Sequence, residues 1–176
     1  MGITRRSAAA LTALVACSAA LAGTAEAKRY PVSGTQTVVD DDAGTFRMAG
    51  DLVGAWRITA FKPLGTEPFL AARGRELFRG CLDRGHDGDC AGDPSGKLRL
   101  KFRYWALFAP GGALRAGACW HPIIGGTGAF KNARGTIQML DVPKEGGGIE
   151  THYAGNVTTG RHAKASAASR MSCGQS

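Results

Sequence analysis

Apolar and polar residues alternate in short runs along most of the chain, and glycine-rich segments separate the runs. In the clearest run, residues 98–104, apolar residues alternate strictly with basic ones. A period of two is typical of a β-strand with one buried and one exposed face. The same criteria predict strands over residues 52–62, 76–82, 98–109, 114–121, 136–141 and 149–158, with weaker candidates over 35–39 and 46–49.

The number and spacing of these runs predict an all-β fold. Seven or eight strands with hardly any helical periodicity are typical of an antiparallel sandwich or a closed barrel. Only residues 71–78 have a partly helical pattern, and Gly74 disfavours a helix there. We therefore expect a loose lead-in over residues 28–45, the folded domain over 46–159 and a flexible tail over 160–176.

Residues 1–27 have the parts of a secretory signal peptide. Two arginines precede an uncharged, apolar run over residues 7–21, and a small-residue cleavage pattern ends at Ala27. Cleavage after Ala27 predicts a secreted or otherwise extracytoplasmic protein. The alternative is a lipoprotein anchored at Cys17, because the three residues before this cysteine are similar to a lipobox.

The chain is basic, with 22 Lys and Arg against 14 Asp and Glu and a formal net charge of +8. Removal of residues 1–27 takes away two arginines and one glutamate, which leaves 20 basic and 13 acidic residues, or +7. A surplus of this size favours weak attraction to anionic envelope surfaces. Nucleic-acid binding is not expected, since the chain has no recognised binding motif and no long basic run.

Part of this charge falls on one face of the predicted sheet. Arg99, Lys101 and Arg103 share a face of their strand, and Arg75 and Arg79 are expected on the neighbouring strand. The cluster is either a solvated exterior or a patch for an acidic polymer or envelope surface. One functional hypothesis is therefore a structural protein held at such a surface. We expect a monomer or a weak oligomer.

Four cysteines remain after the signal segment: Cys81, Cys90, Cys119 and Cys173. An even number in an exported chain is typical of disulfide bonds, and four cysteines allow three pairings. A Cys81–Cys90 bridge would hold the polar loop between these residues and would leave Cys119 to pair with Cys173. The sequence also allows Cys81–Cys119 with Cys90–Cys173. A metal site is disfavoured because no C-x-x-C spacing occurs.

The loop between Cys81 and Cys90 is also a candidate calcium site. Asp83, Asp87 and Asp89 fall at positions 1, 5 and 7 of an EF-hand-like loop, with glycine at position 6. Position 3 is a glycine and position 12 is a proline, which departs from the motif. We expect an acidic, solvated turn with calcium binding as the alternative, and no cofactor.

The most specific motif is glycine-rich and follows His121. Residues 125–135 read GGTGAFKNARG, which resembles the G-G-T-G-x-F-x-x-A-x-G signature of the allene oxide cyclase and dirigent superfamily. The segment looks most like the bacterial secreted proteins grouped as allene oxide cyclase barrel-like, and the similarity extends over residues 51–159. The resemblance implies an eight-stranded antiparallel barrel of the calycin type.

The motif also has a physical interpretation as a structural turn. Gly125, Gly126 and Gly128, with Thr127 among them, permit positive φ at a sharp bend between strands. Phe130 is then placed to plug one end of a barrel. A phosphate-binding loop is the alternative, but the chain has no G-x-x-x-x-G-K-[ST] pattern.

An eight-stranded barrel encloses either packed side chains or one small ligand. Our leading hypothesis is therefore a non-catalytic module that binds a small hydrophobic molecule. The candidates for its core or pocket wall are the aromatic residues Trp56, Phe61, Phe78, Phe102, Tyr104 and Tyr153.

The resemblance implies an alternative, an isomerase or cyclase that acts on a lipid or phenolic substrate. Such catalysis is mainly the positioning of the substrate. The catalytic candidates are Glu76, Tyr104, Glu150 and Tyr153, and His121 is a candidate base. A cavity with Glu or Tyr beside apolar walls would favour the enzyme, whereas a solidly packed lumen would exclude it.

Overall fold

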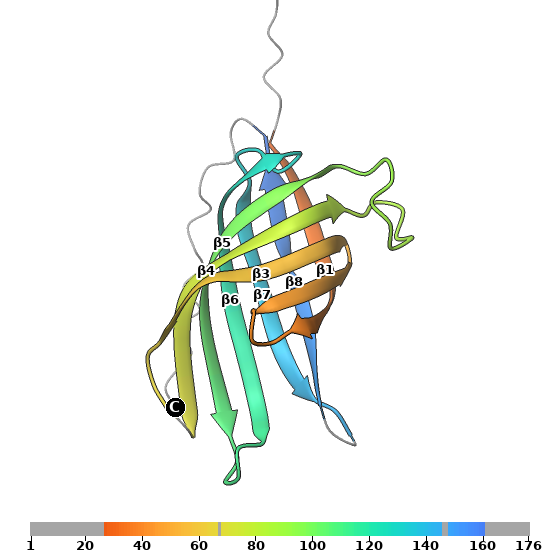
Figure 1. Ribbon diagram of the computed structural model, residues 1–176. Coiled ribbons are helices and arrows are strands. Elements are labelled where there is room, and N and C mark those ends of the chain that lie inside the picture. Colours follow the sequence, from red (N-terminus) through yellow and green to blue (C-terminus); the bar gives the residue numbers. More distant parts are fainter. Residues whose placement is uncertain (1–26, 67, 146–147, 161–176) are drawn as a thin grey trace, which may run out of the picture.

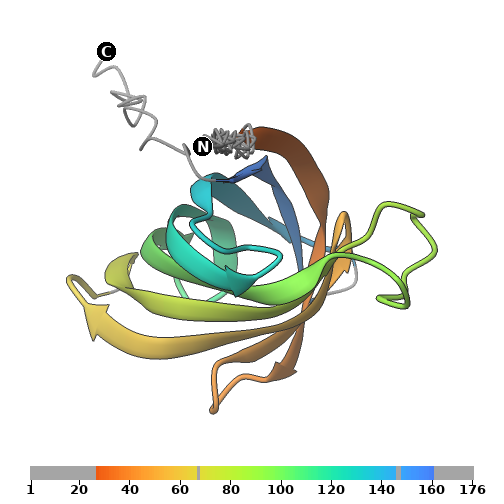
Figure 2. The same ribbon diagram turned by 90° about the horizontal axis from the view of Figure 1, so that it is seen from above.

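The computed structural model describes residues 27–66, 68–145 and 148–160, which form a closed antiparallel barrel of eight strands (Figures 1 and 2). Each strand pairs with the next one in the chain, and β8 pairs with β1 to close the ring. No helix in these ranges is long and apolar enough to span a membrane. The strands are β1 (Lys28–Asp40), β2 (Thr45–Gly50), β3 (Leu52–Pro63), β4 (Phe69–Leu82), β5 (Ser95–Phe108), β6 (Leu114–Gly128), β7 (Arg134–Pro143) and β8 (Ile149–Thr159).

The order of the strands gives the barrel two different ends. The β1–β2, β3–β4, β5–β6 and β7–β8 connections lie at one end, which we call the open end and which is lowest in Figure 1. The β2–β3, β4–β5 and β6–β7 connections lie at the other, which we call the closed end. Because side chains alternate along a strand, each strand sends every second residue into the lumen.

The expected barrel is confirmed, but the lead-in expected over residues 28–45 is wrong. Lys28–Asp40 is strand β1, which pairs with β8 from Lys28 opposite Thr159 to Gln36 opposite Thr151. Residues 71–78 lie within β4 and are not helical. The proposed signal peptide, the lipoprotein cysteine Cys17 and the tail from residue 161 fall outside the described residues.

The glycine motif also differs from the expected bend. Gly125–Gly128 are the last residues of β6, opposite Arg99–Gly96 of β5, and the turn itself follows at Ala129. Gly128 has φ of 62°, and a Cβ at Gly126 would collide with the backbone of Phe130 and Lys97. The glycines therefore allow the β6–β7 turn to fold tightly against the end of β5.

Phe130 fills the closed end from that turn, as the sequence predicts. Its side chain is buried and meets the ring of Phe78 edge-on, with 6.0 Å between the ring centres. Tyr153 ties β8 to β3 nearby, because its hydroxyl accepts a hydrogen bond of 2.9 Å from the Leu52 backbone N–H. The surrounding core is apolar and includes Val32, Met48, Trp56, Leu98, Leu100, Ile137 and Val157.

A disulfide bond joins Cys81 and Cys90 at the closed end, where it closes the β4–β5 connection. The predicted Cys81–Cys90 bridge is thereby confirmed, and the alternative pairing of Cys81 with Cys119 is wrong. Cys119 has no disulfide partner within the described part of the chain, and Cys173 lies outside it.

Replacing Cys81 and Cys90 together by serine should lower the free energy of unfolding by roughly 2–3 kcal/mol, because a loop of this length loses that closure entropy when bridged. Urea denaturation followed by tryptophan fluorescence measures the change. A reducing agent should lower the stability of the unsubstituted protein by the same amount and leave the double variant unaffected. Equal stability of the two proteins without reductant would contradict the bridge.

Candidate functional site

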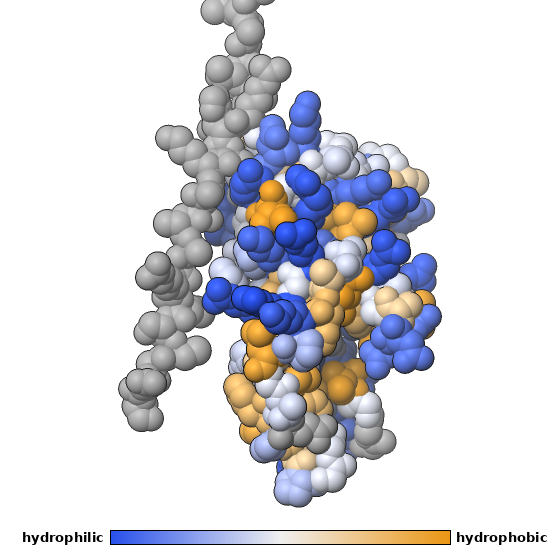
Figure 3. All heavy atoms as spheres, turned by 60° about the vertical axis from the view of Figure 1, so that its left-hand side comes forward, coloured by the Kyte–Doolittle hydropathy of each residue, from blue (hydrophilic) through white to orange (hydrophobic). Residues whose placement is uncertain are grey.

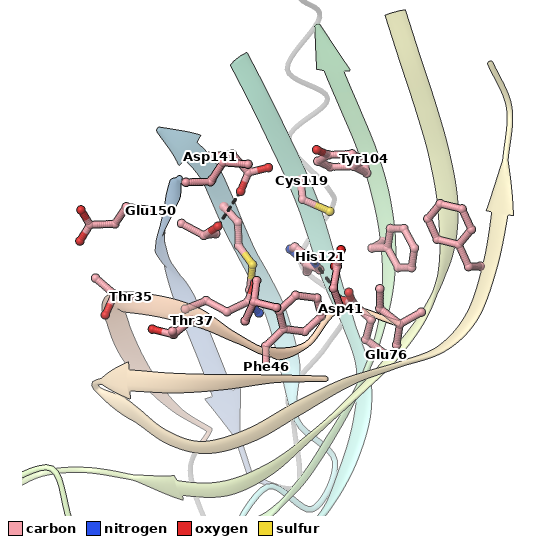
Figure 4. Close-up of a pocket in the computed structure, with 18 of the residues that line it drawn as sticks. Thr35, Thr37, Asp41, Phe46, Glu76, Tyr104, Cys119, His121, Asp141 and Glu150 are labelled. Atoms are coloured by element: carbon pink, nitrogen blue, oxygen red, sulfur yellow. Dashed lines mark hydrogen bonds and ion pairs between the residues drawn. The ribbon is translucent and has the colours of Figure 1, made fainter. Parts of the chain in front are cut away.

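A cavity of about 460 Å³ extends into the barrel from the open end (Figure 4). Its walls are mixed: apolar side chains from several strands stand beside polar and charged ones, which are the more numerous. The strand directions divide the polar groups into a deep layer and an outer layer. The deep layer contains Glu76 of β4 and His121 of β6, and the outer layer contains Tyr104, Cys119, Asp141 and Thr151.

Glu76 and His121 form a buried pair in the deep layer. Carboxylate oxygen Oε2 of Glu76 lies 3.1 Å from Nε2 of His121, and both side chains are almost fully buried. The two residues come from strands on either side of β5, and Phe102 of β5 packs near the His121 ring, with 6.4 Å between the ring centres. Gly74 makes room for Phe102, since a Cβ at this position would collide with the Phe102 ring.

The hydrogen-bonding capacity of this pair is only partly used. Oε2 of Glu76 is close to His121 but not aligned for a hydrogen bond, and Nδ1 of His121 has no partner among the described residues. The indole N–H of Trp56, whose ring meets His121 edge-on at 5.4 Å, also lacks a partner there. A buried polar atom without a partner costs about 1–3 kcal/mol, so the two such atoms of Glu76 and His121, which line the cavity, mark a site that a ligand or water can stabilise.

Asp141 organises the outer layer. Its carboxylate accepts a hydrogen bond of 2.7 Å from Oγ1 of Thr151, and its negative charge acts on the nearby phenol of Tyr104. Gly117 of β6 leaves the space that the Asp141 carboxylate occupies, because a Cβ there would lie 2.5 Å from Oδ2. Burial and the negative charge of Asp141 raise the pKa of Tyr104 well above its usual value, so this phenol stays protonated.

Cys119 contributes a thiol to the same layer (Figure 4). Burial raises the pKa of this thiol, and the charges of Glu76 and Asp141 raise it further. The thiolate is the nucleophilic form of cysteine. Cys119 is therefore a neutral, weakly polar part of the cavity wall at physiological pH rather than a nucleophile.

The structure brings together some of the residues that the sequence singles out. Glu76 and Tyr104 both line the cavity, as do Phe61 and Phe102, and His121 lies in it as the candidate base. Asp141 and Cys119 were not expected there. The alternation of the strand over 136–141 contains a signal for the first, since Ile137, Met139 and Asp141 share its inward face.

Other expected residues lie elsewhere. Trp56 and Phe78 are fully buried core residues that do not line the cavity, and Tyr153 is held at the closed end by Leu52. Glu150 lies at the mouth and points away from the deep layer in Figure 4. Its carboxylate is half-exposed, 4.0 Å from Nζ of Lys144 and 3.8 Å from Nε2 of His152.

The expected calcium ligands are only partly brought together. Asp83 and Asp87 lie close to Asp93, whereas Asp89 accepts hydrogen bonds from the backbone N–H groups of Cys90 and Ala91. Burial alone would raise the pKa of Asp83, but backbone N–H groups, foremost that of Gly88, hold it below its usual value. Asp83 thus stabilises its own loop.

No protein-family model, curated protein or solved structure matches this chain. The chain is a small, closed, eight-stranded antiparallel β-barrel.

The buried phenol of Tyr153 predicts an alkaline transition. Burial raises its pKa from 10.0 to about 12, against a lowering contribution from the Leu52 backbone, and Asp51 and Asp83 raise it further. Because the folded pKa exceeds the unfolded one, the stabilisation is present below about pH 10 and is lost as the pH rises through about 12.

Absorbance titration of tyrosinate should therefore lose a component centred near pH 12 in Tyr153→Phe. Tyr104→Phe, which removes the other buried phenol, serves as the control and should retain that component. A Tyr153→Phe titration identical to that of the unsubstituted protein would contradict the placement of this hydroxyl.

Proposed function

We propose that the barrel binds a small, mostly apolar molecule that carries a polar group at one end. The observation that carries the proposal is the cavity of about 460 Å³, in which apolar side chains stand beside polar ones and a partly unsatisfied polar pair lies at the floor. Ligand cavities typically measure about 300–1,000 Å³, and polar groups placed beside apolar side chains orient the ligand. A lumen packed solid with side chains would have excluded this function.

The two layers define how such a molecule would lie. Its polar end reaches Glu76 and His121, and its apolar part passes Met139 and Phe102 toward Phe46, Ile58 and Phe61. Glu76 accepts a hydrogen bond from a hydroxyl group, whereas a second carboxylate beside it would be repelled. The site therefore favours an alcohol or phenol over a fatty acid of the same length.

A second candidate is an isomerase or cyclase that uses the same cavity. The Glu76–His121 pair favours it, because a carboxylate beside an imidazole can take a proton from one substrate atom and return it to another. Such an isomerisation balances without an oxidant or a cofactor. The resemblance of residues 125–135 to the allene oxide cyclase and dirigent superfamily supports a lipid or phenolic substrate.

Filling the cavity should weaken ligand binding. Met139 lines the cavity, and Met139→Trp should weaken the binding of a fluorescent conjugated-polyene alcohol about tenfold or more, because two or three buried CH₂ groups of the ligand lose their place. Gln138→Trp puts the same side chain on the exposed face of β7 and should bind normally. Equal affinity of both variants would place the ligand outside the barrel.

The catalytic candidate predicts that turnover depends on Glu76. In a panel of reactive lipid and phenolic substrates analysed by chiral chromatography, Glu76→Gln should lower turnover about 100-fold or more, the usual contribution of a general base. Glu145→Gln, on the exposed β7–β8 connection, is the matched control and should retain full turnover. If the unsubstituted protein binds the polyene alcohol but turns over no substrate of the panel, the enzyme is rejected and a binding protein remains.

A further inference from the structure

Large apolar side chains are exposed almost only around the open end of the barrel. Of eleven large hydrophobic residues that are exposed in the described ranges, ten lie at or beside the open-end connections. The exception, Ile124, lies near the closed end. Clustered exposed apolar residues on a small protein mark an interaction site. Five of them lie on or between β3, β4 and β5, and we call these the apolar rim: Phe61, Leu64, Phe69, Trp105 and Leu107.

A band of basic residues adjoins the apolar rim on the same strands. On the outer faces of β4 and β5 the paired positions change from Phe69 opposite Leu107 to Arg73 opposite Arg103. Figure 3 shows one side of the molecule with hydrophobic residues gathered over its lower half and hydrophilic side chains above them. We call the following six exposed residues the basic belt: Arg73, Arg75, Arg79, Arg99, Lys101 and Arg103.

The basic belt carries a positive charge that no described residue neutralises through an ion pair. None of its six side chains forms an ion pair with another described residue. Arg73 and Arg103 are direct neighbours across the strands, and so are Arg75 and Lys101. Like charges at such positions repel one another, so an anionic partner would relieve a strain built into the sheet.

We propose that the open end docks on the surface of an anionic lipid bilayer, with the apolar rim inserted and the basic belt among the lipid headgroups. Trp105 and Arg103 are two positions apart on β5, which corresponds to about 7 Å along the strand. Interfacial protein segments insert apolar side chains by roughly 5–10 Å, with basic residues at the headgroup level. The spacing of Trp105 and Arg103 fits this depth, whereas Arg79 and Arg99 lie farther along β4 and β5 toward the closed end.

A second copy of the chain fits this surface less well than a bilayer. Two rims packed face to face would bring two basic belts close together, and the repulsion would oppose the contact. Asp40 ends β1, and acidic residues 41 and 42 follow in the β1–β2 connection; β1 is three strands away from β4 around the barrel. Their charge keeps that side off an anionic surface, so the barrel docks with its β4–β5 side toward the membrane.

Docking in this orientation has a consequence for the cavity, and this step rests on the proposed function. Phe61 belongs both to the apolar rim and to the cavity wall. The mouth of the cavity therefore borders the inserted surface. A ligand could pass from the bilayer into the lumen without crossing water, so the ligand class would be amphipathic lipids that dissolve in membranes.

The test is flotation of the full chain with extruded vesicles. Vesicles with about 30% phosphatidylglycerol in phosphatidylcholine should bind the protein more tightly than vesicles of pure phosphatidylcholine. Salt at about 0.5 M should weaken the binding. The double substitution Arg73→Gln with Arg103→Gln should lower the partition constant about 25-fold, because each basic residue near an anionic surface contributes about fivefold. Arg29→Gln with Lys131→Gln removes two exposed charges near the closed end and should have little effect.

The apolar rim is tested by a single exposed residue. Trp105→Ser should lower the partition constant about tenfold, whereas Ile124→Ser, an exposed apolar residue near the closed end, should leave it unchanged. Residues outside the described ranges are identical in all variants and cannot produce the difference. The proposal is overturned if the rim and belt variants bind vesicles as well as their control variants do. It is also overturned if sedimentation analysis shows that Trp105→Ser dissociates a dimer.

The two proposals fail in different ways. Met139→Trp should still bind vesicles while losing the polyene alcohol, and Trp105→Ser should still bind the alcohol in solution. If the unsubstituted protein binds the alcohol but does not bind vesicles, the docking proposal is rejected and the proposed function stands. Normal vesicle binding without any alcohol binding would reject the proposed function and the lipid route, but not the docking surface.

Discussion

Closure of the sheet by pairing of β1 with β8 is the constraint on which the rest of the structure depends. Without it, both strands would be free edges and the inward faces of the sheet would meet water. With it, every second side chain points into one shared lumen. Phe130 and the core around Trp56 fill the closed end, and the residues near the open end leave a cavity. The fold thus separates a half that provides stability from a half that is free for function.

The cavity contains a destabilising feature, a buried carboxylate and imidazole whose hydrogen bonds are incomplete. An apolar pair at positions 76 and 121 would pack in the lumen without this cost. The described residues do not compensate for it: the Thr151 hydroxyl donates to Asp141, and Oε2 of Glu76 has no hydrogen-bond partner. Unsatisfied polarity at the floor of a partly apolar cavity is what a site for a polar-ended molecule requires, whether that molecule is bound or transformed.

The sequence predicts the barrel well because strand alternation is a local property. The run over residues 98–104 identifies the outward face of β5, and the position of the basic residues on β4 follows from the same rule. Strand β1 escapes such a prediction, since Lys28–Gly34 has no regular alternation and becomes a strand only through its pairing with β8.

The lumen is harder to predict because irregularities in strand pairing determine which side chains face it. Trp56 and Phe61 are five positions apart and would face opposite sides of a regular strand. A register shift between Ile58 and Ala60 changes the alternation, so one lies in the core and the other at the cavity mouth. Asp141 reaches Tyr104 across β6 because Gly117 leaves room, and this contact needs the register of three strands.

The central claim is that a polar-ended molecule enters the open end and places its polar group at Glu76 and His121. A crystal structure with an ω-brominated fatty alcohol tests it most directly, because anomalous scattering locates the bromine independently of the protein. The expected density has the hydroxyl oxygen within hydrogen-bonding distance of the Glu76–His121 pair and the bromine near Phe61. Bromine on the outer surface of the barrel, or at the cavity floor with the hydroxyl in solvent, would contradict this account.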